Sequence, residues 1–298
     1  MRAGEASRTA QYMALFRALE SARATRERLF SDPLASAFLS GGLRVLASAA
    51  RLPGLHALVP RLVDRRTPGP RISAVLRTRV IDEHVQEALG AGATQLVILG
   101  AGYDSRPYRI GGVAAARVFE VDHPDTQEVK RRCVAAKLGS VPPNVVWVPV
   151  DFLRDDFGSR LSQAGYSPDA PTFFIWEGVT NYLTAETVDA TLRWMSAHSR
   201  DGSRISFTYV DRGLLDGSKP FPGSARWVAT VVRAGEPFTF GLVPEELEHY
   251  LAERGLRLLS DKSTAETYDR LQRAVGAGAR PPAFYHVALA EVMGGAGA

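Results

Sequence analysis

The chain has 298 residues, 45% hydrophobic and 23% charged, and its 36 Lys and Arg against 32 Asp and Glu give a net charge of +4. This composition excludes a disordered, collagen-like or small disulfide-rich protein. The single cysteine, Cys133, excludes an intramolecular disulfide and a multi-cysteine metal site, and we expect no metal ion. Basic residues are scattered among acidic ones, so we expect no nucleic-acid partner. The polar N-terminus lacks a signal-peptide core, which predicts a cytoplasmic protein.

The first ninety residues have a pattern that predicts helices. Apolar residues recur at helical spacing from residue 8 to about residue 87, with breaks at Ser31-Asp32-Pro33 and at residues 66–70. We therefore expect an N-terminal helical cover over residues 1–90. Within it, residues 41–63 lean apolar but are interrupted by arginines and prolines, which excludes a membrane span and leaves an amphipathic segment on a surface as an option.

After residue 92 the pattern changes to short apolar runs separated by helix-length polar segments. This alternation predicts an α/β fold with a doubly wound parallel sheet. The five predicted strands are residues 95–99, 117–121, 145–150, 172–176 and 204–210. Two later apolar runs, residues 256–259 and 284–292, have no clear helix between them and predict an antiparallel, hairpin-like pair closing the sheet.

The expected organisation is thus a Rossmann-like core over residues 91–298. It has seven strands, the last of them antiparallel. Residues from about 211 to 254 are irregular and then helix-like. We expect them to form a helical lid, because loops at the carboxyl edge of such a sheet carry specificity.

The first predicted strand runs directly into a glycine-rich turn, Gly100-Ala101-Gly102-Tyr103-Asp104-Ser105. Such a turn lets a ligand approach the backbone, and the amides that follow it are free to donate. The third glycine of the dinucleotide fingerprint is absent, because Ser105 occupies its position, and Asp104 would repel a pyrophosphate. A tight turn with glycine for steric reasons only is the alternative.

A second signal lies at the end of the next strand. Asp122 follows Gly102 by twenty residues, where a carboxylate can accept hydrogen bonds from both ribose hydroxyls of an adenosine. Without a phosphate cradle, the two signals favour S-adenosylmethionine (SAM), which carries a sulfonium and an ammonium group, over NAD. An NAD(P)-dependent oxidoreductase and a catalytically silent binding protein are the alternatives from other classes.

Two further strand ends carry acidic residues. Asp151 and Phe152 follow the third strand, where they could contact the amine and the ring of adenine, or start a surface loop. Glu177 ends the fourth strand at the edge where ligands bind in open α/β folds. It could face the methionine end of a cofactor or be a satisfied structural residue.

In this order the segments resemble the leucine carboxyl methyltransferase family, especially its bacterial branch related to polyketide carboxyl O-methyltransferases of the tetracenomycin type. The resemblance covers most of the chain. It rests on Ser31-Asp32-Pro33, Arg77-Thr78-Arg79-Val80-Ile81-Asp82, Leu99-Gly100-Ala101-Gly102-Tyr103-Asp104-Ser105-Arg106-Pro107-Tyr108-Arg109, Glu120-Val121-Asp122-His123-Pro124 and Glu177-Gly178-Val179-Thr180-Asn181-Tyr182-Leu183.

The resemblance implies a SAM-dependent methyltransferase and a set of cofactor contacts. Arg79 would pair with the SAM carboxylate, as a planar guanidinium can do bidentately. The turn of Gly100, Ala101 and Gly102 would approach the amino-acid part, Asp122 would hold the ribose, Asp151 and Phe152 would contact adenine, and Glu177 would lie near the methionyl portion. One departure is Ser21, which stands where protein-modifying members carry a lysine. This departure weakens the case for a protein C-terminus as substrate.

The acceptor group is the remaining question. A carboxylate is ionised at neutral pH and needs no base, whereas a phenol would benefit from a histidine base such as His249 or His286. No histidine lies in a catalytic motif, so we expect carboxylate O-methylation of a small polyketide-like or acyl compound in secondary metabolism, with a phenolic acceptor as the alternative. Residues that could orient the acid are Tyr12, Tyr182, Tyr209 and Arg212. Aromatic residues suited to such a substrate are Phe16, Phe221, Trp227, Phe238 and Phe240.

Overall fold

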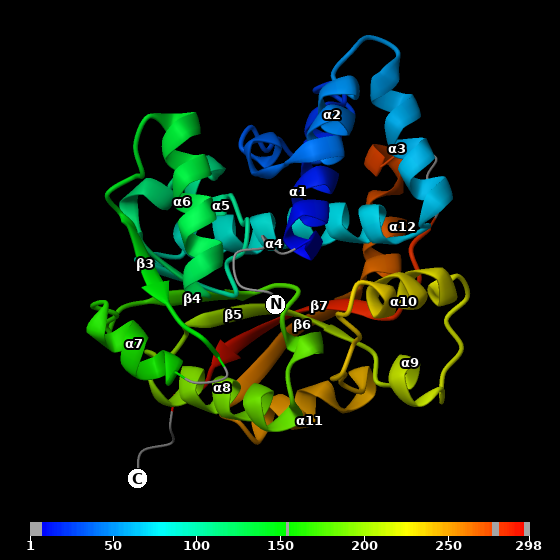
Figure 1. Cartoon of the computed structure of the whole chain (residues 1–298). Coiled ribbons are helices and arrows are strands. Elements are labelled where there is room, and N and C mark those ends of the chain that lie inside the picture. Colours follow the sequence, from blue (N-terminus) through cyan, green and yellow to red (C-terminus); the bar gives the residue numbers. More distant parts are fainter. Residues whose placement is uncertain (1–7, 153–154, 276–279, 295–298) are drawn as a thin grey trace.

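The computed structural model describes residues 8–152, 155–275 and 280–294, and its centre is a seven-stranded sheet with helices on both faces (Figure 1). The strand order is β3-β2-β1-β4-β5-β7-β6. The first five strands pair in parallel, and β7 is antiparallel to both β5 and β6. The strands are β1 (Gln95–Leu99), β2 (Arg117–Asp122), β3 (Val145–Pro149), β4 (Thr172–Trp176), β5 (Arg204–Val210), β6 (Leu256–Ser263) and β7 (Tyr285–Val292). The predicted α/β class and seven-stranded sheet are confirmed.

Four α-helices precede β1 in the described chain. They are α1 (Arg8–Ser21), α2 (Gly41–Ala49), α3 (Leu55–Arg66) and α4 (Pro70–Gly90), with a 3-10 turn η1 (Ala35–Phe38) between the first two. Pro70 begins α4, a position where its missing N–H costs nothing. At the predicted break, the Asp32 carboxylate accepts hydrogen bonds from the amides of Leu34 and Ala35, both at 3.0 Å, at the start of η1.

Helices cover the sheet on two faces because its strands are apolar on both sides. Alternate residues of the central strands pack on α4 on one face, and on α8 and α11 on the other. The elements between strands are α5 (Arg106–Arg109), η2 (Val113–Ala115), α6 (Pro124–Leu138), α7 (Phe157–Gln163), η3 (Thr180–Tyr182), α8 (Ala185–Ala197), α9 (Gly213–Asp216), α10 (Ser224–Arg233), η4 (Pro244–Glu246) and α11 (Leu247–Ala252).

The segment between β6 and β7 differs from the sequence-based expectation. The two strands do pair antiparallel, but α12 (Thr264–Val275) connects them, so the expected hairpin is wrong. This helix is polar on average, but its apolar residues Ala265, Tyr268 and Leu271 recur at helical spacing. Ala265 and Tyr268 are buried, and Tyr268 packs with Val75 and Leu76 of α4. The sequence therefore carried an amphipathic pattern here that the expected hairpin did not take into account.

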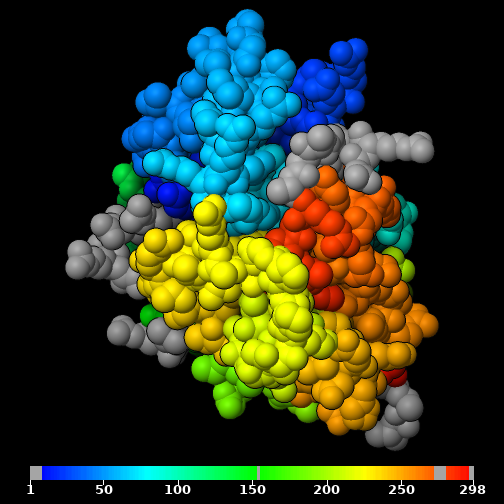
Figure 2. Space-filling view, turned by 90° about the vertical axis from the view of Figure 1, so that its right-hand side faces the viewer, coloured from blue at the N-terminus to red at the C-terminus, as the bar shows by residue number. Residues whose placement is uncertain are grey.

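The N-terminal helices and the segment 211–254 lie on neighbouring parts of the surface. Figure 2 shows the blue and cyan N-terminal residues directly above the yellow residues of α10. At the start of the segment, the Arg212 amide donates to the Leu242 carbonyl at 2.9 Å, and the Leu242 amide donates to the Val210 carbonyl at 3.1 Å. The segment 211–254 therefore leaves the end of β5 and returns to it before α11.

Candidate functional site

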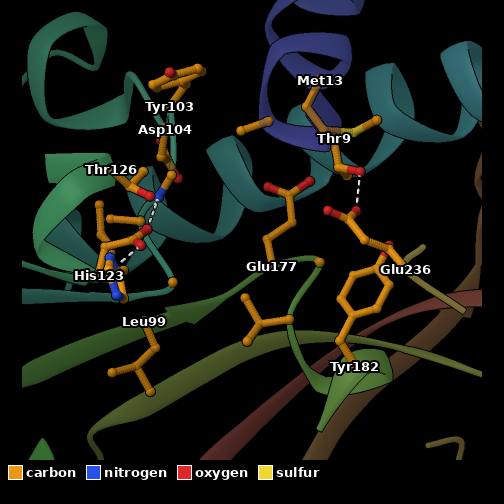
Figure 3. Close-up of a pocket in the computed structure, with 18 of the residues that line it drawn as sticks. Thr9, Met13, Leu99, Tyr103, Asp104, His123, Thr126, Glu177, Tyr182 and Glu236 are labelled. Atoms are coloured by element: carbon orange, nitrogen blue, oxygen red, sulfur yellow. Dashed lines mark hydrogen bonds between the residues drawn. The ribbon is translucent and has the colours of Figure 1, made fainter. Parts of the chain in front are cut away.

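A cavity of about 830 Å³ lies at the carboxyl ends of β1, β2 and β4. Figure 3 shows side chains entering it from the sheet edge and, from above, from α1. We divide its wall into two parts. The polar half is formed by residues at the strand ends, including Gly100, Gly102, Asp104, Asp122, Asp151, Phe152 and Glu177. The aromatic half is formed by Thr9, Met13, Tyr182, Trp227, Glu236, Phe238 and Tyr285.

The glycine turn after β1 has a steric reason for its composition. Gly100 has φ +65° and Gly102 has φ +41°, in the left-handed region that side chains rarely adopt. A Cβ atom at Gly100 would also collide with the Val179 side chain. Between them, the Ala101 amide donates to the Val121 carbonyl at 3.0 Å, which ties the turn to β2. Gly100, Ala101 and Gly102 all line the cavity.

Asp122 stands at the end of β2, directly beside this turn. The Gly102 amide donates to its Oδ2, and the His123 amide donates to its Oδ1 at 2.6 Å. Burial raises the pKa of Asp122, although these two hydrogen bonds oppose the shift. A carboxylate oxygen has two acceptor positions, so each oxygen keeps one for a ligand. The two carboxylate oxygens of Asp122 can therefore accept hydrogen bonds from two hydroxyl groups at once.

Glu177, after β4, belongs to a buried network of charges. Its Oε2 lies 2.9 Å from Arg106 Nη2, and its Oε1 accepts a hydrogen bond from Arg77 Nε at 3.4 Å. Arg106 also donates to Asp104 at 2.6 Å and to Asp82 at 2.8 Å. Figure 3 shows Glu177 pointing into the space between the polar half and the side chains of the aromatic half. A carboxylate held by two arginines in this way stays in one position when a ligand enters.

The same network sets the charge state of Asp104. Burial alone would raise its pKa, but Arg106 and Lys130 outweigh that effect and lower the pKa to about 2. Burial would likewise lower the pKa of Arg106, yet Asp104, Glu177 and Asp82 raise it well above its usual value. Both groups are therefore ionised at neutral pH. Asp104 and Arg106 therefore present fixed charges in the polar half.

The arginine expected to face the cavity is replaced by its neighbour. Arg79 does not line the cavity: its side chain is 41% exposed, and it donates to Glu83 at 2.9 Å and to the Leu29 carbonyl at 3.0 Å. Arg77 is 4% exposed and lines the cavity, with its guanidinium carbon 4.2 Å from the centre of the Tyr285 ring. Residues two apart on a helix point to nearly opposite sides, so only one arginine can face inward.

The remaining predicted residues of the polar half reach the cavity. Asp151 and Phe152 both line it, as do His123 and Asp125 at the start of α6. The Phe152 ring also packs against Phe157, with ring centres 6.4 Å apart. The adenine contacts predicted for Asp151 and Phe152 stay a prediction, which their place in the cavity wall allows.

The aromatic half is assembled from distant parts of the chain. The Tyr182 and Phe238 ring centres are 5.9 Å apart, and Trp227 stacks on Tyr285 at 5.8 Å. In the same half the Thr9 hydroxyl donates to Glu236, a contact drawn in Figure 3. Burial raises the pKa of Tyr182 above its usual value. Its phenol therefore stays protonated at neutral pH and can donate a hydrogen bond.

Two of the three predicted catalytic residues lie elsewhere. Tyr209 is fully buried in β5, and its hydroxyl donates to Asp261 at 2.8 Å. Its side chain lies on the face of the sheet covered by α8 and α11, since neighbouring strand residues alternate between faces. Arg212 Nε donates to the Gly241 carbonyl at 3.3 Å, and this residue does not line the cavity. Tyr182 alone of the three faces the cavity.

The other expected acceptor residues divide in the same way. Trp227 and Phe238 line the cavity, whereas Tyr12, Phe16, Phe221 and Phe240 do not. Of the six histidines, all within the described residues, only His123 lines the cavity, and it lies at the polar half. His249 pairs with Glu253 at 3.3 Å on the surface, and His286 lies 3.0 Å from Asp261. Neither proposed base faces the aromatic half.

The sequence reasoning did not single out several cavity residues. Arg77 and Arg106 stand within the recognised motifs, but their roles depend on which way they point. Thr9, Met13, Glu236 and Tyr285 carry no local signal at all, because they reach the cavity from three separate segments. Among the helices of the described residues, none is long and apolar enough to cross a membrane.

Comparison with known proteins agrees with this architecture. A Streptomyces coelicolor protein is 33% identical over 270 residues, covering 88% of this chain and 90% of its own. A Streptomyces avermitilis protein is 34% identical over 255 residues, covering 83% and 85%. Both carry the name of an S-adenosyl-L-methionine-dependent methyltransferase.

Solved structures agree on the fold. The crystal structure of a Thermobifida fusca protein described as a methyltransferase has a TM-score of 0.57 at 16% identity, and the match covers 93% of this chain and 97% of that one. Residues 10–196 match the leucine carboxyl methyltransferase family. The chain therefore belongs to the leucine carboxyl methyltransferase family and is a SAM-dependent methyltransferase.

Proposed function

We propose that the protein methylates a carboxylate oxygen of a small, largely apolar molecule, such as a polyketide-like or acyl compound of secondary metabolism. The observation that carries this proposal is the aromatic half of the cavity. It offers rings and a protonated Tyr182, and no histidine among the described residues faces it. A carboxylate needs no base to become a nucleophile, whereas a phenol does.

The polar half fits the cofactor. When bound, SAM supplies an electrophilic methyl group on its sulfonium. The Asp122 carboxylate, with one acceptor position left on each oxygen, suits the two ribose hydroxyls. Asp151 and Phe152 would contact adenine, the Gly100, Ala101 and Gly102 backbone would lie along the amino-acid part, and Glu177 would attract its ammonium group.

Arg77 takes the role first assigned to Arg79. It is the arginine of α4 that faces the cavity, and it lies next to Glu177. One guanidinium and one carboxylate side by side match the zwitterionic end of an amino acid. The buried Tyr285 ring under Arg77 limits its movement and keeps water away from that side.

The chain's task in the transfer is alignment and exclusion of water. The acceptor oxygen must approach in line with the methyl group, and holding two reactants in such a geometry lowers the barrier substantially. We assign the orienting hydrogen bond to the Tyr182 hydroxyl, while Trp227 and Phe238 would pack on the apolar body of the acceptor.

The same proposal includes the division of the chain. Residues 1–90 act as a helical cover, residues 91–298 as the methyltransferase core, and residues from about 211 to 254 as a lid. The Thr9–Glu236 hydrogen bond supports this reading, because it joins the cover to the lid across the cavity. The cavity, about 830 Å³, is also in the range of small-molecule sites.

The test is a screen of aromatic and fatty acids and of phenols with methyl-labelled SAM, followed by alkali. A methyl ester releases labelled methanol in alkali, whereas an aryl methyl ether does not. We expect alkali-labile product, with turnover that stays flat from pH 6.5 to 9. Alkali-stable product, with turnover rising through a basic pKa, would overturn the carboxylate proposal in favour of the phenolic alternative.

A further inference from the structure

The helical hairpin of α2 and α3 exposes apolar side chains that no other part of the structure covers. Four of them stand out by their exposed fractions. They are Val45 at 70%, Leu52 at 56%, Leu58 at 45% and Leu62 at 47%. Scattered exposed apolar residues need no explanation, but these four fall within eighteen consecutive residues.

Geometry places part of this set on one side of α3. Leu58 and Leu62 are one helical turn apart and so share a face. The opposite side of the helix is used for packing, since Val59 and Pro60 are buried. The outward-facing leucines are therefore not part of the core that holds the hairpin to the protein.

Arginines surround these apolar side chains. Residues 41–66 contain five arginines, Arg44, Arg51, Arg61, Arg65 and Arg66, and a single acidic residue, Asp64. Arg71 holds Asp64 through two hydrogen bonds of 2.9 and 2.6 Å, so that carboxylate is already neutralised. We call these five arginines and the four exposed apolar residues the α2–α3 face.

The arginines of the α2–α3 face lack acidic partners. Some exposed arginines elsewhere do have one, as in Arg193–Asp189 and Arg280–Asp269. None of the five arginines forms an ion pair with a described carboxylate. Arg44 and Arg51 donate only to neutral acceptors, the Leu39 carbonyl and the Ser36 hydroxyl. The face thus combines an uncompensated positive charge with exposed aliphatic groups.

The position of the hairpin suits a docking role. Figure 1 shows α2, α3 and the loop between them projecting at the end of the molecule opposite α8 and α11. Gly69, just after α3, adjoins Trp227 of α10: a Cβ at Gly69 would lie 3.4 Å from that ring. Because Trp227 lines the cavity, the hairpin leads towards the cavity wall.

We propose that the α2–α3 face docks the enzyme onto the surface of an anionic lipid bilayer. Arginines beside exposed leucines match headgroup phosphates beside acyl chains, which is how amphipathic segments bind membrane surfaces. A nucleic acid bound to the arginines would leave the exposed leucines without an apolar partner. A second copy packed on the same face would set five arginines against five others. The inference does not depend on which acceptor group is methylated.

The experiment is flotation of the full-length protein with vesicles of phosphatidylcholine alone and with 30% phosphatidylglycerol, at low and moderate salt. We expect binding to the anionic vesicles, little to the neutral ones, and weakening by salt. Replacing Arg61 and Arg65 with serine should lower the partition coefficient at least tenfold, since each arginine contributes about fivefold. Leu58→Ser with Leu62→Ser should lower it comparably.

The matched control replaces Arg193 and Leu259 with serine, an exposed arginine and an exposed leucine away from the α2–α3 face. It should bind vesicles like the wild type, and all variants should melt within a few degrees of it. Equal binding to both vesicle types, or equal loss in the control, would overturn the proposal. So would light scattering that shows a dimer which Leu58→Ser dissociates, because a second copy would then cover the face.

Discussion

The two halves of the cavity are built by different means. The polar half comes from residues directly after β1, β2, β3 and β4, and its charged groups are fixed to one another, as Glu177 is to Arg106. The aromatic half comes from segments as far apart as Thr9 and Tyr285, and rings in contact form it. This difference is what we expect if, as we propose, the polar half binds the cofactor and the aromatic half binds the acceptor.

The largest expected effect is on the polar half. Replacing Asp122 with alanine should raise the dissociation constant of S-adenosylhomocysteine about 100-fold, because two hydrogen bonds to a charged group are lost. Isothermal titration calorimetry measures it. Asp125, which lines the same cavity but has a side chain 49% exposed, provides the control: its alanine variant should bind within threefold of wild type. Equal losses in both would mean that charge in general, and not Asp122, holds the ligand.

The second prediction separates the two arginines of α4. Arg77→Ala should weaken S-adenosylhomocysteine binding about 30-fold, because a buried charge-assisted contact disappears. Arg79→Ala removes the same charge two residues away, outside the cavity, and should change binding less than twofold. The same calorimetry decides between them. A larger loss for Arg79 than for Arg77 would restore the assignment that the motif first suggested.

The third prediction concerns the free energy of unfolding, which should fall in acid because of the charged groups of the polar half. The pKa of Asp104 is about 2 in the folded protein, against 3.8 as its ordinary value. Its ionised form therefore stabilises the fold by about 2 kcal/mol above pH 4, and this contribution is lost as the pH falls towards 2. Urea unfolding of Asp104→Asn should show a lower free energy at pH 7 and a shallower decline below pH 4.

The control for this prediction is Asp169→Asn, a change at an exposed loop carboxylate. It should leave the unfolding free energy and its pH dependence close to those of the wild type. If Asp104→Asn and the wild type lost stability in parallel between pH 4 and pH 2, the network around Arg106 would not be the source of the acid sensitivity.

The smallest effect is expected in the aromatic half. Phe238→Ala should raise the KM for the acceptor about tenfold, because one apolar contact surface is removed, and leave S-adenosylhomocysteine binding within twofold. Phe221, which packs on Phe284 but does not line the cavity, is the matched control. Steady-state kinetics with each variant measures the split. A change in cofactor affinity in Phe238→Ala would show that the two halves do not bind separate ligands.

Much of the core could be predicted from the sequence. β1, β4 and β5 begin and end where their predicted apolar runs do. Gly100 follows β1, Pro171 precedes β4 and Asp211 follows β5, and these residue types favour the end of a strand locally. By contrast, α12 was missed, because its few apolar residues are set among many polar ones, although they recur at helical spacing and pack on α4.

Side-chain direction limited the prediction of the site. Asp122, Asp151 and Glu177 were found because a residue at the carboxyl end of a parallel strand reaches the ligand-binding edge whatever surrounds it. Tyr209 was expected at the cavity but lies away from it, because the sequence did not show which face of β5 packs on α8 and α11. Arg212 was misplaced because the chain after β5 folds back onto Gly241.

The sequence alone thus determined the family, the sheet and the polar half of the cavity. These depend on short contiguous motifs whose geometry the backbone imposes at each strand end. Only the tertiary structure decided that Arg77 faces inward instead of Arg79, and that Thr9, Trp227, Phe238 and Tyr285 share one wall. The physical reason is that helix rotation and the meeting of distant segments are set by packing over the whole core, which no local pattern specifies.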